Sequence, residues 1–257
     1  MKSLRRDEQL LLLGVPVVVI VTLIGWLIWR FSVTLDDIEM RQLAWSVVGS
    51  LLVEHIVLTV LCTVAVVVTA IPLGILLTRR GWRVATPAAM ALGNFGQAAP
   101  VIGVIVLLAI LIGFGTGTAV LALTLYAFLP ALVNTIEGLR SVDPKMVEAA
   151  RGMGMSGPQV LWRIELPLAL PIILEGVRTA LVLLVGTATF GAFIDAGGLG
   201  ELIQTGINLM RYSILVSGAL LVALLALIVD WAGRVVEIAA RPRGIRMEEP
   251  ETLEVPA

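Results

Sequence analysis

The side chains that most often carry out chemistry in proteins are scarce in this sequence. It contains a single histidine, His55, and a single cysteine, Cys62, which lies in an apolar run. One cysteine cannot form an internal disulfide, and one histidine excludes a histidine-rich metal site or a histidine-based catalytic cluster. No nucleophile, base and orienting group occur together, and there is no G-x-x-x-x-G-K-[ST] phosphate-binding loop. We therefore expect no catalytic residues, no metal site and no cofactor bound by this chain, and we expect His55 to be a local hydrogen-bonding partner beside Glu54.

A cluster of charged residues interrupts the apolar runs between residues 137 and 165, where eight charged side chains occur. Most of it belongs to DPKMVEAARGMGMSGPQVLWRIELP, residues Asp143–Pro167. Asp143 is suited to cap a short helix whose first residue is proline. Two glycines, the second of them Gly154, allow the chain to reverse, and Ser156 begins a capping box for another helix. The sequence therefore predicts two short helices joined by a tight turn.

This predicted helical hairpin carries too many charges to cross hydrocarbon. One of its sides is nevertheless apolar, and Ala149 and Ala150 are small enough to let another backbone approach closely. Two interpretations follow from the residues alone. The hairpin either docks on a soluble protein at the membrane face or lies flat among lipid headgroups.

The composition identifies the class of protein. Hydrophobic residues make up 58% of the 257 residues and charged residues 14%, and the mean hydropathy is +1.00. An ordinary soluble domain has about 25% charged residues. We therefore predict an all-α polytopic membrane protein with about six transmembrane helices. The formal net charge of −1 provides no broad basic surface, so we expect the lipid membrane as a partner and no nucleic acid.

Uncharged runs and turn signals divide the chain into segments. The first uncharged run is long enough to cross a bilayer, and no A-x-A cleavage site precedes Arg30, so we expect a retained span rather than a signal peptide. The predicted segments are a cytoplasmic N-terminus (1–8), a first transmembrane helix (9–30), a periplasmic or extracellular connector (31–55), a core domain (56–240) and a flexible cytoplasmic tail (241–257). Within the core we expect spans at about 56–78, 84–112, 118–139, 168–194 and 212–234, with a glycine-rich loop at 195–213.

The run from Val84 to Ile136 contains no charged residue and is too long for one crossing. We place a turn at Gly113–Thr118, which leaves two spans. The first of these contains helix-breaking and polar residues from Asn94 to Pro100, including Gln97. Broken backbone at membrane depth is tolerated where it is buried in protein or lines a cavity. The segment is therefore either a wall of a translocation path or a connector at the cytoplasmic interface.

Two charged residues lie inside the predicted fifth span. Glu175 and Arg178 are one helical turn apart, so we expect them to form a structural ion pair.

The distribution of lysine and arginine predicts the orientation. With the N-terminus inside, fourteen of these residues fall in cytoplasmic segments, whereas only Arg30, Arg41 and Arg211 fall outside. This asymmetry obeys the positive-inside rule. It places both termini and the hairpin Asp143–Pro167 in the cytoplasm of a multi-pass protein.

The hairpin resembles the EAA loop of binding-protein-dependent ABC importer permeases. The sequence has Glu148-Ala149-Ala150, then Gly154, Ile164 and Leu166-Pro167 at the spacing of that pattern. The resemblance implies a type I ABC importer permease fold in a bacterial cytoplasmic membrane, with cytoplasmic coupling helices that dock on an ATPase subunit. The residues that it assigns to ATPase coupling are Glu148, Ala149, Ala150, Gly154, Ile164, Leu166 and Pro167.

A finer resemblance covers most of the chain, from about Glu54 to Trp231. Several segments are similar to the permeases for glycine betaine, choline and carnitine, and related permeases for methionine or phosphonate share some of them. These segments are IPLGILLTRR (Ile71–Arg80), EAARGMG (Glu148–Gly154), ELPLALPIILEGVRTA (Glu165–Ala180) and GTATFGAFIDAGGLGELI (Gly186–Ile203). One departure is Asp195, where the family favours a small residue; its carboxylate either attracts a cation or pairs with Arg211. The residues that we assign to the candidate translocation path are Asn94, Gln97, Pro100, Asn134, Thr187, Thr189 and Asp195.

The resemblance also implies partners. They are two ATP-binding cassette subunits that bind ATP and Mg, a second permease subunit, identical or paralogous, and a periplasmic or lipid-anchored substrate-binding protein. The alternatives are a permease for another small solute, a secondary carrier or a membrane scaffold. A secondary carrier needs intramembrane ionisable groups and often internal repeats, and the sequence has few of the former and none of the latter.

Overall fold

The computed structural model describes residues 6–240. The predicted tail (241–257) lies wholly outside these described residues, as do the first five residues of the predicted cytoplasmic N-terminus (1–8). Between residues 6 and 240 every regular element is helical, and no strand occurs.

The helices follow one another with short connections. They are α1 (Arg6–Ser32), α2 (Asp37–Gln42), α3 (Trp45–Thr78), η1 (Arg83–Ala85), α4 (Thr86–Ala98), α5 (Val101–Ile112), α6 (Thr116–Arg140), α7 (Pro144–Gly152), α8 (Gly157–Val160), η2 (Leu161–Glu165), α9 (Leu166–Thr187), η3 (Ala188–Ile194), α10 (Gly200–Asn208) and α11 (Tyr212–Ala240). Here η2 is a π-helix, whereas η1 and η3 are 3₁₀ helices.

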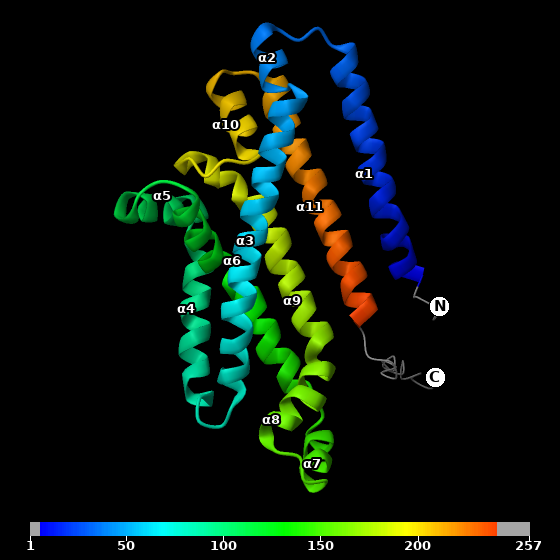
Figure 1. Cartoon of the computed structure of the whole chain (residues 1–257), viewed down its shortest axis with the longest axis vertical. Helices are drawn as coiled ribbons and strands as arrows, with labels where there is room; N and C mark the ends of the chain where they lie inside the picture. Colours follow the sequence, from blue (N-terminus) through cyan, green and yellow to red (C-terminus); the bar gives the residue numbers. More distant parts are fainter. Residues whose placement is uncertain (1–5, 241–257) are drawn as a thin grey trace, which may run out of the picture.

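The long helices lie side by side as a bundle (Figure 1). Five helical segments of the described chain are long and apolar enough to cross a membrane, or six if the bent pair α4 and α5 is one span. The short helices gather at the two ends of the bundle: α7 and α8 at one end, and α2 and α10 at the other (Figure 1). We call these the α7–α8 end and the α2–α10 end.

Helix α6 is the centre of the bundle and packs between α3 and α9. Its buried face combines four alanines, among them Ala119, Ala122 and Ala131, with larger leucine side chains. On α9, a Cβ added at Gly176 would lie 2.4 Å from the Cβ of Asn134, so only glycine fits at this contact. Small residues of this kind let membrane helices approach closely, because van der Waals packing drives their association in lipid.

Helix α3 differs from the sequence expectation. It begins at Trp45, so the predicted connector (31–55) holds α2 and the first turns of α3, and the span begins before residue 56. Its 34 residues correspond to about 51 Å, more than the hydrocarbon thickness of about 30 Å. Tertiary contacts stabilise the polar part of this extension. Glu54 accepts a hydrogen bond from the Gly198 N–H at 3.1 Å, and His55 Nε2 lies 2.9 Å from the Val185 carbonyl oxygen.

The predicted span 84–112 is broken within the segment that the sequence indicated, Asn94 to Pro100, into the helices α4 and α5. Helices α4 and α5 meet at 95°, and the break lies at Ala99 and Pro100. Ala99 has φ −70° and ψ 138°, the extended conformation that a following proline favours, and Pro100 donates no backbone N–H to continue the helix. Because α4 runs away from the α7–α8 end, the break lies nearer the middle of the bundle (Figure 1). The break therefore does not lie at the end of the bundle that holds the hairpin Asp143–Pro167 (Figure 1).

The glycine-rich segment 195–213 is not simply a loop. After a turn at Gly197 and Gly198, it forms α10, which packs against α11 as a short helical hairpin. The predicted sixth span (212–234) is the longer helix α11, which continues to Ala240. Helix α10 was missed because its glycines, which resemble turn residues in the sequence, serve close packing instead: a Cβ at Gly206 would lie 2.5 Å from the Leu215 nitrogen.

Helix α1 lies on the outer side of α11 (Figure 1). Two tryptophans hold it there: Trp26 Nε1 donates to Ser217 Oγ at 3.0 Å, and Trp231 Nε1 of α11 donates to the Leu12 carbonyl oxygen at 2.9 Å. Most of the remaining α1 surface is exposed valine, leucine and isoleucine, which is typical of a lipid-facing helix.

Candidate functional site

The α7–α8 hairpin, defined as residues 144–165, forms as the sequence predicts. Asp143 Oδ1 accepts a hydrogen bond from the Lys145 N–H at 2.8 Å at the start of α7, with Pro144 as the first helical residue. The Ser156 N–H donates to Gln159 Oε1 at 2.8 Å at the start of α8. Both caps satisfy N–H groups that a helix leaves without a partner at its first turn.

Gly154 has a structural role that its position in the pattern alone did not explain. Its φ is +85°. The Gly154 N–H donates to the Arg151 carbonyl at 2.9 Å, and the Met155 N–H donates to the Ala150 carbonyl at 3.2 Å. These are the two bonds of a Schellman motif, in which the residue after the helix adopts a left-handed conformation that glycine favours. Gly154 therefore determines the angle at which the chain leaves α7.

The remaining coupling candidates divide between an exposed and a packed group. Glu148 and Ala149 are exposed on α7 and are free for contact with a partner. Ala150 is buried, and Leu166 packs against the cluster formed by Leu139, Val142, Ala169 and Ile173. Ile164 is half-buried, and Pro167 is exposed near the beginning of α9. Met153 and Trp162, which are 72% and 70% exposed, add large apolar side chains to the exposed surface of the hairpin.

Sequence reasoning missed the connection between the hairpin and the bundle. The segment Leu161–Glu165 is a π-helix, a rare form that often occurs at functional sites. Its last residue, Glu165, is buried and accepts a hydrogen bond from Arg79 Nη2 at 2.5 Å. Arg79 follows the last residue of α3, so this ion pair joins the hairpin directly to a long membrane helix. The two residues are 86 positions apart, and no local pattern could have paired them.

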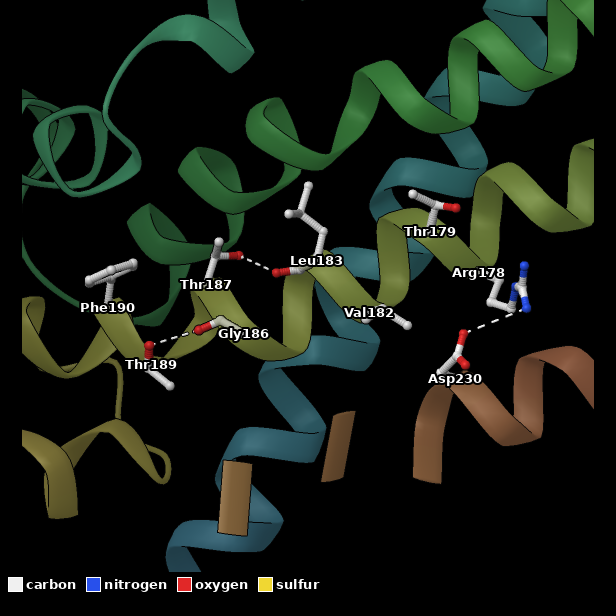
Figure 2. Close-up of a pocket in the computed structure, with 9 residues that line it drawn as sticks. All are labelled: Arg178, Thr179, Val182, Leu183, Gly186, Thr187, Thr189, Phe190 and Asp230. Carbon is white, nitrogen blue, oxygen red and sulfur yellow. Dashed lines mark hydrogen bonds and ion pairs between the residues drawn. The ribbon is translucent and has the colours of Figure 1, made fainter. Parts of the chain in front are cut away.

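A groove runs along α9 (Figure 2). We call it the α9 groove; it has a volume of about 530 Å³. The predicted path residues Thr187 and Thr189 both line it. The other lining residues are Arg178, Thr179, Val182, Leu183, Gly186 and Phe190 of α9 and η3, and Asp230 of α11.

The hydroxyl groups of Thr187 and Thr189 donate hydrogen bonds to nearby backbone carbonyls. Thr187 Oγ1 donates to the Leu183 carbonyl at 2.8 Å, and Thr189 Oγ1 donates to the Gly186 carbonyl at 2.7 Å (Figure 2). Both bonds stay within the same helical segment, as threonine often does inside membrane helices. The groove therefore presents methyl groups and the ring of Phe190 between its charged end and η3.

The expected ion pair between Glu175 and Arg178 does not form. Arg178 instead faces α11, where Nη1 lies 3.6 Å from Asp230 Oδ1 and Nε lies 3.8 Å from Glu237 Oε2 (the Asp230 contact is drawn in Figure 2). Glu175 lies on the exposed side of α9, as do Thr179 and Gly186. Helix packing decided the partner, because α11 brings two carboxylates toward the arginine.

The other predicted path residues lie elsewhere. Asn134 belongs to the contact between α6 and α9, and its Nδ2 donates to the Pro130 carbonyl at 2.9 Å. Asn94, Gln97 and Pro100 lie on α4 and at its break, and the Gln97 Nε2 donates to the Tyr126 carbonyl at 3.5 Å. The structure therefore brings Thr187 and Thr189 together in one groove and does not bring the α4 residues to it.

Asp195 lies near two other carboxylates at the α2–α10 end. It adopts a left-handed conformation with φ 56° and ψ 34° at the end of η3, a region that aspartate enters more readily than most residues with a side chain. It does not pair with Arg211, because Arg211 pairs with Asp36 at 2.5 Å. Desolvation, with the nearby carboxylates of Glu54 and Asp195, raises the pKa of the Glu201 carboxyl above its ordinary value.

Comparison with known proteins agrees with this architecture. Residues 70–241 match the family model described as "Binding-protein-dependent transport system inner membrane component". The chain is 35% identical over 193 residues to the glycine betaine/carnitine/choline transport system permease protein OpuCB of Bacillus subtilis, covering 75% of this chain and 88% of that one. It is 39% identical over 203 residues to the osmoprotectant import permease protein OsmW of Salmonella typhimurium, covering 77% of this chain and 94% of that one.

Solved structures share the fold. A structure of the MetNI methionine ABC transporter in an inward-facing conformation superposes with a TM-score of 0.67 over 81% of this chain and 100% of the matched chain, at 23% identity. An amino acid ABC transporter structure superposes with a TM-score of 0.64 over 80% of this chain and 100% of the matched chain, at 18% identity.

Proposed function

Since this chain belongs to the family of binding-protein-dependent transport system inner membrane components, we propose that it forms the translocation path for a quaternary ammonium osmoprotectant such as glycine betaine, choline or carnitine. It is the permease subunit of an ABC importer, with the type I permease fold, and is not itself an enzyme. The names of its relatives, OpuCB and OsmW, support the class of substrate.

The observation that carries the importer mechanism is the α7–α8 hairpin. A side-chain hydrogen bond caps the start of each of its two helices, its exposed surface combines Glu148 and Ala149 with two large apolar side chains, and Glu165 joins it to α3. In our proposal this surface docks on an ATP-binding cassette subunit, which binds ATP and Mg. The pair Arg79–Glu165 then passes movement of the hairpin to the membrane helices, which have two arrangements that ATP and loaded binding protein bias in turn.

The orientation follows from this docking. We propose that the α7–α8 end faces the cytoplasm and that the α2–α10 end faces the substrate-binding protein. The arginines at the ends of α3 and α6 support this assignment through the positive-inside rule. The inner-membrane location itself is a property of the family.

The open face of α9 supports a path between two permease subunits. Glu175, Thr179 and Gly186 are exposed on it, whereas the exposed residues of α1 are mainly aliphatic. Ionisable side chains within spans usually face protein or a water-filled cavity rather than lipid. A trimethylammonium group neither donates nor accepts hydrogen bonds, so the methyl groups of the α9 groove and the cation–π face of Phe190 suit its passage.

Uptake by the reconstituted complex tests this proposal. The permease would be assembled in proteoliposomes with its ATPase subunits and loaded binding protein, and uptake of labelled glycine betaine, choline, carnitine, methionine and a phosphonate would be measured. We expect ATP-dependent uptake of at least one quaternary amine and none of methionine or phosphonate. Uptake that persists after the ATPase is inactivated would indicate a secondary carrier instead.

A further inference from the structure

A second cavity lies at the α7–α8 end of the bundle. It has a volume of about 520 Å³, and we call it the arginine cavity. Segments far apart in the sequence surround it: the end of α3 with the turn and η1 that follow it, the end of α6, α7, and the end of η2. The charged residues that line it are Arg79, Arg80, Arg83, Arg140, Arg151 and Glu165.

Within residues 6–240, most of the positive charge in this cavity is not balanced by acidic side chains. Among the described residues that line the cavity, Glu165 alone carries a carboxylate, and Arg79 already pairs with it. Arg80, Arg83, Arg140 and Arg151 form no ion pair or side-chain hydrogen bond with any other residue of the described range 6–240. Four guanidinium groups around one cavity repel one another unless an anion lies among them, and guanidinium groups match the geometry of phosphate oxygens.

The position of the cavity along the membrane helices indicates the source of such an anion. Two membrane-spanning helices end at it, α3 at Thr78 and α6 at Arg140. Two large apolar side chains beside the cavity are also exposed: Trp82, in the turn after α3, is 51% exposed, and Val84, in η1, is 89% exposed. Tryptophan and exposed apolar side chains next to arginines are typical of the zone where lipid headgroups meet the acyl chains. Basic pockets between membrane helices at this level bind anionic headgroups.

We propose that the arginine cavity binds the phosphate of an anionic phospholipid headgroup. Arg80, Arg83, Arg140 and Arg151 hold the phosphate oxygens, while Trp82 and Val84 contact the first part of the acyl chains. The proposal goes beyond the transport function and does not depend on it, because binding of a lipid can be measured on this chain without any transport.

The test measures lipid binding to the full chain, purified in a neutral detergent. Native mass spectrometry would compare dioleoylphosphatidylglycerol with dioleoylphosphatidylcholine for the unchanged chain, the variant Arg83→Gln/Arg140→Gln and the control Arg163→Gln. Arg163 is an exposed arginine of the same hairpin that does not line the cavity. We expect the unchanged chain to bind the anionic lipid at least about tenfold more tightly than the zwitterionic one. The affinity of the double variant for the anionic lipid should be lower by about tenfold or more, and that of the control should change less than about twofold.

Several outcomes would overturn the proposal. One is equal binding of the zwitterionic lipid, and another is an equal loss in Arg163→Gln, which would mean that only general surface charge matters. Displacement of the lipid by millimolar inorganic phosphate would identify a site for a free anion rather than a headgroup. Displacement by the purified ATPase subunit would identify part of a protein interface. Size-exclusion elution of each variant as the unchanged chain shows that a loss of binding is not a loss of folding.

Discussion

At the scale of single residues, Gly154 and Gly152 differ although both lie in the same turn sequence. Gly154 has a φ of +85°, whereas Gly152 is the last residue of α7 and has helical geometry. Neither has an atom within 4 Å of a Cβ added to it. The difference between them is therefore one of backbone conformation and not of space.

Gly154→Ala should consequently weaken the docking of the hairpin. Forcing an L-residue into the left-handed region costs about 1–2 kcal/mol, which corresponds to about a five- to thirtyfold loss in ATPase association if the turn must form for docking. Gly152→Ala is the matched control and should change association less than about twofold. Titration of the ATPase subunit against the purified permease measures both. Equal effects of the two variants would contradict a conformational role for Gly154.

Phe190 and Phe193 form a second pair of comparable residues. Their ring centroids are 6.4 Å apart, but only Phe190 lines the α9 groove. Because cation–π contacts contribute about 0.5–2 kcal/mol, Phe190→Leu should lower ATP-driven uptake of the quaternary amine by about fivefold, with ATPase association unchanged. Phe193→Leu should change uptake less than about twofold. A larger effect of Phe193→Leu would place the path outside this groove.

At the scale of elements, the ion pair Arg79–Glu165 connects the π-helix of the hairpin to α3. The side chain of Glu165 is 11% exposed and that of Arg79 is 36% exposed. Removing the carboxylate leaves the arginine able to turn toward solvent, so we expect a modest loss of stability and a larger loss of coupling. Glu165→Gln should lower uptake per ATP hydrolysed at least about threefold, and the exchange Arg79→Glu/Glu165→Arg should restore part of it.

The control for this prediction is Glu137→Gln. Glu137 is exposed on α6 near the same end of the bundle. If it lowers the transport-to-hydrolysis ratio as much as Glu165→Gln does, the effect reflects general surface charge and not the connection between hairpin and helix.

Glu201 on α10 makes the stability of the folded protein depend on pH. The raised pKa of this carboxyl means that the folded protein binds its proton more tightly than the unfolded chain does. The contribution of this carboxyl to the free energy of unfolding is therefore fully present below its pKa in the unfolded chain and is lost as the pH rises through its pKa in the folded protein. Glu201→Gln should thus raise the Tm in detergent at pH 8 and change it little at pH 4, as differential scanning fluorimetry can measure. A larger gain at pH 4 would contradict the sign.

At the scale of the whole molecule, the orientation of the bundle can be tested with two methionines of nearly equal exposure. Met153 is 72% exposed at the α7–α8 end, and Met210 is 71% exposed at the α2–α10 end. Cys62 is buried, so Cys62→Ala provides a background without a native thiol. A membrane-impermeant maleimide should label Met210→Cys in intact spheroplasts, and Met153→Cys only in inside-out vesicles. The reverse pattern would refute the docking of an ATPase at the hairpin.

Local signals in the sequence were sufficient for the helical hairpin and for the membrane class. A capping side chain, a proline at the first helical position and a positive-φ glycine act within about five residues, so Asp143–Pro167 could be interpreted without the fold. The same locality explains the failures. Glu175 was paired with Arg178 because they are neighbours on one helix, whereas α11 supplied Asp230 and Glu237 from more than fifty residues away.

The sequence by itself determined that this is a helical membrane protein, that one charged hairpin stands apart from the spans, and which family the chain resembles, because apolar run length, capping residues and motif spacing are properties of consecutive residues. Only the tertiary structure decided that α3 begins at Trp45, that α4 and α5 meet at 95°, and that Arg79 pairs with Glu165. It also brought five arginines from distant segments around one cavity. These features depend on which helices pack together, and the close approach of α6 to α9 through Gly176 and of α6 to α3 sets that arrangement.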